Sequence, residues 1–102
     1  MATTAEKTVT VTNSMGIHMR PADMLSRAAG QFQCSVVIEK DGQLTDCKSI
    51  MSLLGLGAQK GQMLRIRADG DDAQQAVTAL AELFEQGFEE EDSEMTSEEN
   101  SP

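Results

Sequence analysis

The dipeptide Asp41-Gly42 constrains the fold of this chain more than any other feature of the sequence. It stands between two runs in which apolar or β-branched residues alternate with polar ones. Aspartate followed by glycine in that setting is the strongest short-range signal for a two-residue β-hairpin. The sequence therefore predicts antiparallel strands over residues 34–40 and 43–48, joined by a tight turn.

A two-residue turn also fixes the register of this hairpin. It places Ile38 opposite Thr45 and Val36 opposite Cys47. Because side chains alternate between the two faces of a sheet, one face of the hairpin carries most of its apolar residues. The residues predicted to share this face, and to be buried, are Cys34, Val36, Ile38, Thr45 and Cys47.

The spacing of apolar residues divides the rest of the chain into strands and helices. Alternation predicts strands over residues 7–12 and 62–68. Apolar residues three or four positions apart predict helices over residues 21–30, 49–54 and 73–87, with a left-handed glycine closing the first of them. The order is strand-helix-strand-strand-helix-strand-helix. This order is typical of an α+β domain, in which helices cover one face of a mainly antiparallel sheet.

The length of 102 residues is that of one domain. We expect the fold to occupy residues 7–88, after a loose, flexible N-terminal end at residues 1–6 and before an acidic tail at residues 89–102. The tail holds seven acidic residues and no basic one, so most of the net charge of −9 lies there. A segment this polar buries too little apolar surface to fold, and we expect it to be disordered.

The composition excludes several classes of function. Eight basic and ten acidic residues precede the tail, and such a nearly balanced charge does not favour nucleic-acid binding, which needs clustered Lys and Arg. No apolar run reaches the 18 residues of a membrane-spanning helix, so we expect no membrane insertion. The N-terminal residues do not resemble a secretory signal, and the two cysteines are expected to be reduced thiols in the cytoplasm.

His18 is the only histidine of the chain and lies within residues 16–22, which read GIHMRPA. Histidine titrates near neutral pH, so its ring can act as a neutral nucleophile. Arg20 carries a planar guanidinium that matches phosphate oxygens. Pro21 marks the first turn of a helix, because a proline there leaves no N–H unpaired. Helix beginnings attract anions, so this combination indicates a histidine that can be phosphorylated.

Residues 16–22 resemble the active-site signature of HPr, the histidine-containing phosphocarrier of the sugar phosphotransferase system. Residues 47–57, which read CKSIMSLLGLG, resemble the serine phosphorylation segment of the same family. The resemblance covers about residues 7–88. It implies an open-faced β-sandwich, in which four antiparallel strands lie under three helices.

The same resemblance implies a function and its partners. An HPr-like chain accepts a phosphoryl group on His18 from phospho-enzyme I, which phosphoenolpyruvate charges, and passes it to a histidine of a sugar-specific EIIA domain. Such a chain is a stoichiometric carrier rather than an enzyme, acts as a monomer, and needs no cofactor or metal. The competing hypothesis is a regulatory interaction module that binds a kinase or a regulator without sugar transport.

Family position also implies roles for single residues around His18. Arg20 would hold the phosphoryl oxygens, Gly16 would let the backbone turn sharply, and Pro21 would support the helix start. Arg27 is either a second contact to phosphate or partner, or an ordinary solvated helix residue.

A docking surface for partner proteins is expected near His18. Its candidates by family position are the apolar residues Met19, Ile50, Met51 and Leu54. For Ile50 and Leu54, the alternative is that they pack the short helix into the core.

Ser49 has two interpretations. A serine before a short helix is a preferred N-cap, which satisfies a backbone N–H of the first turn. By family resemblance it is also a regulatory site for HPr kinase/phosphorylase. A phosphate there would add about −1.5 to −2 charge and disturb the approach of enzyme I.

Overall fold

The computed structural model describes residues 3–89. Within them, four strands and three helices follow one another in the predicted order, and a short 3-10 turn, η1, comes last. The elements are β1 (Thr4–Thr10), α1 (Met19–Gly30), β2 (Ser35–Lys40), β3 (Gln43–Asp46), α2 (Ile50–Leu56), β4 (Met63–Asp69), α3 (Ala73–Glu85) and η1 (Gly87–Glu89).

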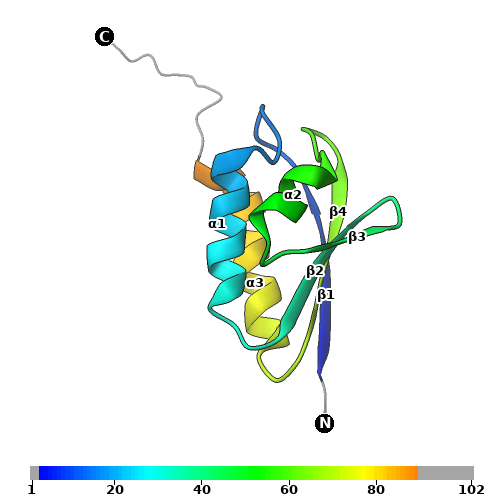
Figure 1. The fold of residues 1–102 in the computed structure, drawn as a ribbon, viewed down its shortest axis with the longest axis vertical. Coiled ribbons are helices and arrows are strands. Elements are labelled where there is room, and N and C mark those ends of the chain that lie inside the picture. The colour runs from blue at the N-terminus through cyan, green and yellow to red at the C-terminus, as the bar shows by residue number, and fades with distance from the viewer. Residues whose placement is uncertain (1–2, 90–102) are drawn as a thin grey trace.

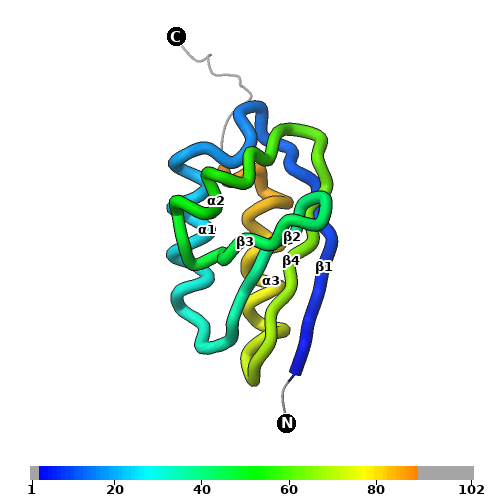
Figure 2. Tube along the Cα trace, turned by 45° about the vertical axis from the view of Figure 1, so that its right-hand side comes forward, coloured from blue at the N-terminus to red at the C-terminus, as the bar shows by residue number. Residues whose placement is uncertain are grey.

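The strands form one antiparallel sheet in the order β1-β4-β2-β3. The helices lie together on one face of this sheet and leave the other face bare (Figure 1). Helix α3 packs along β1 and β4, and α1 packs against α2 and α3 (Figure 2). This arrangement is the open-faced β-sandwich that the family resemblance implied.

The β2–β3 hairpin has the predicted register. Ile38 pairs with Thr45, and Cys47 N donates a hydrogen bond of 2.9 Å to Val36 O just beyond the end of β3. The five residues expected to share one face are all buried. The turn at Asp41-Gly42 has positive φ at both residues, as a tight two-residue hairpin loop requires.

The N-terminal boundary of the sheet was predicted wrongly. β1 begins at Thr4, so residues 4–6 are part of the sheet and not of a loose end. Ala5 is buried and pairs with Ala68 of β4, while Thr4 Oγ1 donates to Asp69 Oδ1 at 2.6 Å. Residues 4–6 show little alternation of apolar and polar side chains, so the sequence pattern did not reveal the strand. Their strand conformation depends on pairing with β4.

The end of α1 differs from the expectation in its backbone geometry. Gly30 is the last helical residue, but the chain continues in the right-handed region, with φ −81° at the C-cap residue Gln31. Gln31 N and Phe32 N donate to the carbonyls of Ala28 and Ala29, at 3.2 and 3.1 Å. The helix thus ends in a tightened turn that needs no left-handed glycine.

Asp72 is the N-cap residue of α3, but its carboxylate makes no hydrogen bond to this helix and binds a different segment. It accepts hydrogen bonds from Gln33 N at 2.8 Å and from Cys34 N at 3.0 Å. These bonds hold the pKa of Asp72 below its ordinary value. Gly70 passes so close to Cys34 that an added Cβ would lie 2.7 Å from the Cβ of Cys34. The turn before α3 is therefore fastened to the segment that enters β2.

The core between sheet and helices is mostly aliphatic, with two aromatic rings at one end. Phe84 of α3 and Phe88 of η1 are buried, and their rings meet edge to face with centroids 4.9 Å apart. Gly87 lies between them with φ +62°. The turn at this glycine ends the last helix, as predicted, and returns Phe88 to the core.

Candidate functional site

His18 is the N-cap residue of α1, directly before Met19. Its backbone is extended (φ −101°, ψ −165°), and its carbonyl accepts a hydrogen bond from Ala22 N at 3.0 Å. Its side chain is partly exposed. The first amides of a helix have no intrahelical acceptors and form the positive end of the helix dipole. His18 therefore adjoins the end of α1 that attracts anions.

Gly16 shapes the loop that leads into α1. It has φ +67°, and an added Cβ would collide with Ala58 O and lie 2.9 Å from Gln59 Cα. The neighbouring Ile17 N donates to Ala58 O at 3.0 Å. The buried side chain of Asn13 donates to Gly16 O at 2.8 Å. The loop is thus held against the segment after α2, a support that the sequence pattern did not reveal.

Arg20 lies in the first turn of α1 with an exposed side chain. Its Nη1 donates a hydrogen bond of 2.7 Å to Phe88 O. The guanidinium is therefore tied to the end of the fold, 68 residues along the chain. Sequence reasoning missed Phe88 as a neighbour of this site, because nothing in the local pattern links the two segments.

Pro21 and Arg27 occupy different places on α1. Pro21 is buried in the first turn, where a missing N–H leaves no acceptor unpaired. Arg27 is two turns from Arg20, which corresponds to about 10 Å along the helix axis. Its Nε lies 3.0 and 2.9 Å from the two carboxylate oxygens of Asp23. The helix therefore separates Arg27 from Arg20 and His18 and gives it a carboxylate partner.

Ser49 is the N-cap of α2. Its Oγ accepts a hydrogen bond from Ser52 N at 3.2 Å, and its carbonyl accepts one from Leu53 N at 3.0 Å. The N-cap prediction is confirmed. The side chain is partly exposed, and its regulatory phosphorylation stays a prediction.

The residues proposed as a docking surface divide into two groups. Met19 and Met51 are 59% and 76% exposed, and they belong to α1 and α2, which pack against each other. Ile50 and Leu54 are partly buried against the core, as their alternative interpretation states. Met15, in the loop before His18, is 71% exposed and was not among the sequence candidates. Its position three residues before His18 was the feature of the sequence that could have marked it as a docking candidate.

Comparison with known proteins assigns this architecture to a family. A family model described as "PTS HPr component phosphorylation site" matches residues 5–86. The chain belongs to the HPr family of phosphocarrier proteins. The match spans nearly the whole described fold and contains the residues that the sequence singled out, from Gly16 to Leu54.

Individual HPr proteins are similar over most of their length. The phosphocarrier protein HPr of Xylella fastidiosa (strain Temecula1) is 39% identical over 85 residues, which are 83% of this chain and 96% of that protein. The crystal structure of HPr from Thermoanaerobacter tengcongensis has a TM-score of 0.82 at 37% identity and covers 85% of this chain and 98% of that chain. The Bacillus subtilis catabolite repression protein Crh, crystallised as a swapped dimer, has a TM-score of 0.67 at 34% identity, with coverages of 72% and 85%.

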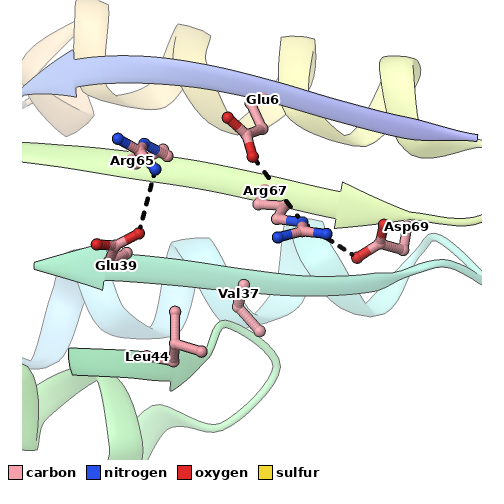
Figure 3. A pocket seen from close by; sticks show the side chains of 7 residues that line it. All are labelled: Glu6, Val37, Glu39, Leu44, Arg65, Arg67 and Asp69. Atoms are coloured by element: carbon pink, nitrogen blue, oxygen red, sulfur yellow. Dashed lines mark hydrogen bonds and ion pairs between the residues drawn. The ribbon is translucent and has the colours of Figure 1, made fainter. Parts of the chain in front are cut away.

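A shallow pocket of about 230 Å³ lies on the bare face of the HPr sheet, apart from the site at α1 (Figure 3). Three ion pairs lie along it: Arg65 Nη1 is 3.4 Å from Glu39 Oε1, and Arg67 Nε is 3.5 Å from Asp69 Oδ2 and 3.9 Å from Glu6 Oε2. None of the predicted site residues lines it. The predicted phosphorylation site therefore lies at the start of α1 and not in this pocket.

Both cysteines are buried free thiols. Burial raises the pKa of the Cys47 thiol to about 12. Burial also raises the pKa of Cys34, with the carboxylate of Asp72 adding to the effect. Neither thiol has the lowered pKa of a reactive cysteine.

Residues 3–89 contain neither a metal-binding cluster nor a membrane-spanning helix. No group of three or more His, Cys, Asp or Glu side chains in this range is arranged to hold a metal ion. None of the helices described there has the length and apolar character needed to span a bilayer. The predicted acidic tail from residue 90 onwards lies outside the described residues.

Proposed function

We propose that this chain is a cytoplasmic phosphocarrier that accepts a phosphoryl group on His18 from phospho-enzyme I and passes it to a histidine of an EIIA domain. The observation that carries the proposal is the placement of His18. Its partly exposed imidazole belongs to the residue that begins α1, and Arg20 follows in the first turn. Membership of the HPr family supports the same chemistry.

In the proposed transfer, the neutral imidazole attacks the incoming phosphorus in line, through Nδ1 by family resemblance. A new P–N bond forms as the bond between phosphorus and the donor breaks. Catalysis of such a loose, anionic transfer consists mostly of positioning and charge stabilisation. The amides at the start of α1 and the guanidinium of Arg20 are the groups suited to stabilise the phosphoryl oxygens.

The second step is the onward transfer to EIIA, in which the imidazole of the EIIA histidine replaces that of His18 on phosphorus. No net proton movement is needed, because the leaving imidazole regains the lone pair that it had shared. An exposed site suits this exchange, since the phosphoryl group must be reached by two different proteins. The exposed Met19 and Met51 offer adaptable apolar contacts for both.

The test is incubation of the purified chain with enzyme I and phosphoenolpyruvate, followed by measurement of acid-labile phosphate. We expect stoichiometric labelling of the native chain and of Ser49→Ala, and none of His18→Ala. Transfer onward to EIIA should then remove the label. Undiminished acid-labile label on folded His18→Ala would refute the assignment of the site.

We further propose that Ser49 is a regulatory phosphorylation site. Its Oγ now accepts a hydrogen bond at the start of α2, next to the exposed Met51. A phosphate would add about −1.5 to −2 charge beside the proposed docking surface and hinder enzyme I. Incubation with HPr kinase/phosphorylase and ATP should label the native chain and not Ser49→Ala. Absence of acid-stable label on the native chain would end this proposal.

The second candidate function is a regulatory interaction module without sugar transport. The likeness to the catabolite repression protein Crh favours it. A module of this kind would depend on Ser49 and not on His18. It predicts that His18→Ala keeps all function in cells whereas Ser49→Ala loses it, which is the opposite of what the phosphocarrier predicts.

A further inference from the structure

The loop between β1 and α1 carries His18 at its end and lies beside the segment between α2 and β4 (Figure 2). At the start of the loop, Val11 N donates a hydrogen bond of 2.9 Å to Gln62 O. At its end, Ile17 N donates one of 3.0 Å to Ala58 O. The stretch between these two anchors is ordered by other contacts.

Asn13 supplies such a contact from within the loop. The residue is only 2% exposed, and its Nδ2 donates to Gly16 O at 2.8 Å. In the opposite direction, Gly16 N donates to Asn13 O at 3.2 Å. Removing one partner of a buried hydrogen bond is costly, because the group that remains is still shielded from water. The turn from Asn13 to Gly16 is therefore closed by a side chain as well as by the backbone.

The carbonyl of Gly16 links Asn13 to the backbone of His18. It accepts hydrogen bonds from Asn13 Nδ2 at 2.8 Å and from His18 N at 3.1 Å. The N–H of the same peptide unit belongs to Ile17 and donates to Ala58 O. This peptide unit is thus held at both its carbonyl and its N–H. Because a peptide unit is planar, the two bonds together set the direction in which the chain reaches His18.

We propose that Asn13 is a positioning residue for phosphoryl transfer to His18. It acts through the peptide unit between Gly16 and Ile17, which holds the backbone of His18 at the start of α1. In-line attack requires aligned reacting atoms, and a misplacement of about 1 Å can lower a rate by about 100-fold. The effect on the rate rests on the phosphocarrier function proposed above, whereas the effect on the backbone of His18 does not.

The simpler interpretation is that Asn13 only stabilises the turn. Its loss would then lower the free energy of unfolding and leave the rate at which the folded chain accepts phosphate unchanged. The two interpretations therefore differ in the transfer rate of the folded protein and not in its stability.

The test compares the native chain with Asn13→Ala and Asn13→Asp. Asn13→Ala removes the whole side-chain amide. Asn13→Asp keeps the shape of the side chain, but at about pH 8 an ionised carboxylate can only accept hydrogen bonds and cannot donate to Gly16 O. Slow transfer in both variants thus traces the effect to the lost hydrogen bond, and slow transfer in Asn13→Ala alone would trace it to packing.

Thr12→Ala is the matched control. Thr12 lies in the same loop, and its Oγ1 donates to Phe84 O at 3.3 Å. The control therefore also loses a hydrogen bond from a side chain to a backbone carbonyl, but one outside the peptide unit between Gly16 and Ile17. Urea unfolding of all four chains establishes that each is folded under the conditions of the assay.

Two readouts separate the placement of His18 from its use. The first is hydrogen exchange of the backbone amides of Ile17 and His18, followed by NMR without any phosphoryl donor. The second is single-turnover labelling by phospho-enzyme I over a range of carrier concentrations, which gives a maximal rate and a half-saturating concentration. Loss of a positioning residue lowers the maximal rate, whereas loss of a docking residue raises the half-saturating concentration.

We expect the amides of Ile17 and His18 to exchange about three- to tenfold faster in both Asn13 variants, as the loss of one hydrogen bond implies. We expect the maximal rate to fall about 10- to 100-fold in both, with the half-saturating concentration within about twofold of the native one. Thr12→Ala should match the native chain in both readouts.

A native maximal rate in either folded Asn13 variant, or equal slowing in Thr12→Ala, would overturn the proposal. A raised half-saturating concentration at an unchanged maximal rate would overturn it as well. If the native chain itself takes up no phosphate, the proposed function fails and amide exchange alone decides. Faster exchange in the Asn13 variants then supports the positioning of His18, and unchanged exchange contradicts it.

Discussion

Gly16 and Arg20 flank His18 and shape its surroundings by different means. Gly16 combines a left-handed backbone with direct contact to the segment after α2, so it determines where His18 lies. Arg20 brings a fixed positive charge and ties it to Phe88 O. The first acts through conformation and packing, the second through charge, and each can be altered separately.

Replacing Gly16 with Ala should destabilise the fold more than the same change at Gly57. Both residues have φ +67°, but only at Gly16 does an added Cβ meet neighbouring backbone. Left-handed strain costs about 1–2 kcal/mol at either site. Overpacking at Gly16 adds about 1–3 kcal/mol. Urea unfolding of both variants measures the difference, and equal losses would contradict this account.

Arg20→Lys should slow phosphoryl acceptance while keeping the positive charge. Lysine lacks the planar fork that matches phosphate oxygens. A hydrogen bond to a charged group contributes about 1.5–3 kcal/mol, so a loss of about tenfold or more in rate is expected. Arg27→Lys is the matched control, since Arg27 is two turns away and bonded to Asp23. Single-turnover labelling with enzyme I compares the two, and similar rates in both variants would argue against a role for the guanidinium.

At the scale of elements, the loops between helices and sheet are fastened by polar side chains from distant segments. Asp72 at the start of α3 binds the backbone that leads into β2. Lys40 of β2 donates to Leu56 O at the end of α2, and Lys48 donates to Phe32 O just after α1. The two lysine ammonium groups thus donate hydrogen bonds to carbonyls at or near the C-terminal ends of α2 and α1. The negative end of a helix dipole favours a positive charge at this position.

Asp72→Asn should destabilise the fold at neutral pH, and the deficit should shrink in acid. The folded-state pKa of Asp72 is lowered, so the ionised form stabilises the fold above the ordinary pKa of about 3.9. That contribution is lost as pH falls through the lower folded-state pKa. Urea unfolding of both proteins from pH 7 down to about pH 3 measures it. A deficit that stays constant with pH would exclude this linkage.

Features that depend on neighbouring residues could be predicted from the sequence, whereas contacts between distant segments could not. The turn at Asp41-Gly42 fixed the hairpin register, and the order of apolar periods led to the correct sheet-and-helix arrangement. The strand at residues 4–6 was missed because its pairing with β4 stabilises it. The proximity of Phe88 to Arg20 was missed because it depends on how α1 and α3 pack. His18 and Ser49 were both recognised as helix starts, since capping is a local property.

At the scale of the whole molecule, the two faces of the sheet differ in what covers them. One face carries all three helices, and the proposed chemistry lies at the N-terminal ends of α1 and α2 (Figure 1). The other face bears a shallow pocket with paired charges. Both cysteines lie on the covered side, within the core.

Thiol reactivity should therefore report opening of the whole fold. Cys34 and Cys47 are buried, and the pKa of Cys47 is raised to about 12, so little thiolate forms at pH 8. We expect the native chain to react slowly with a disulfide reagent such as DTNB, and two thiols per chain to react at once in concentrated urea. Rapid reaction of two thiols in the native state would contradict the described core.

The tip of the β2–β3 hairpin projects from the fold on the side away from α1 (Figure 1). Gln43, the first residue of β3 after this turn, has an exposed side chain. A fluorophore or an affinity handle attached there would leave the proposed phosphorylation site unobstructed. Encounters with donor and acceptor proteins can accordingly be followed by anisotropy on an otherwise unaltered carrier.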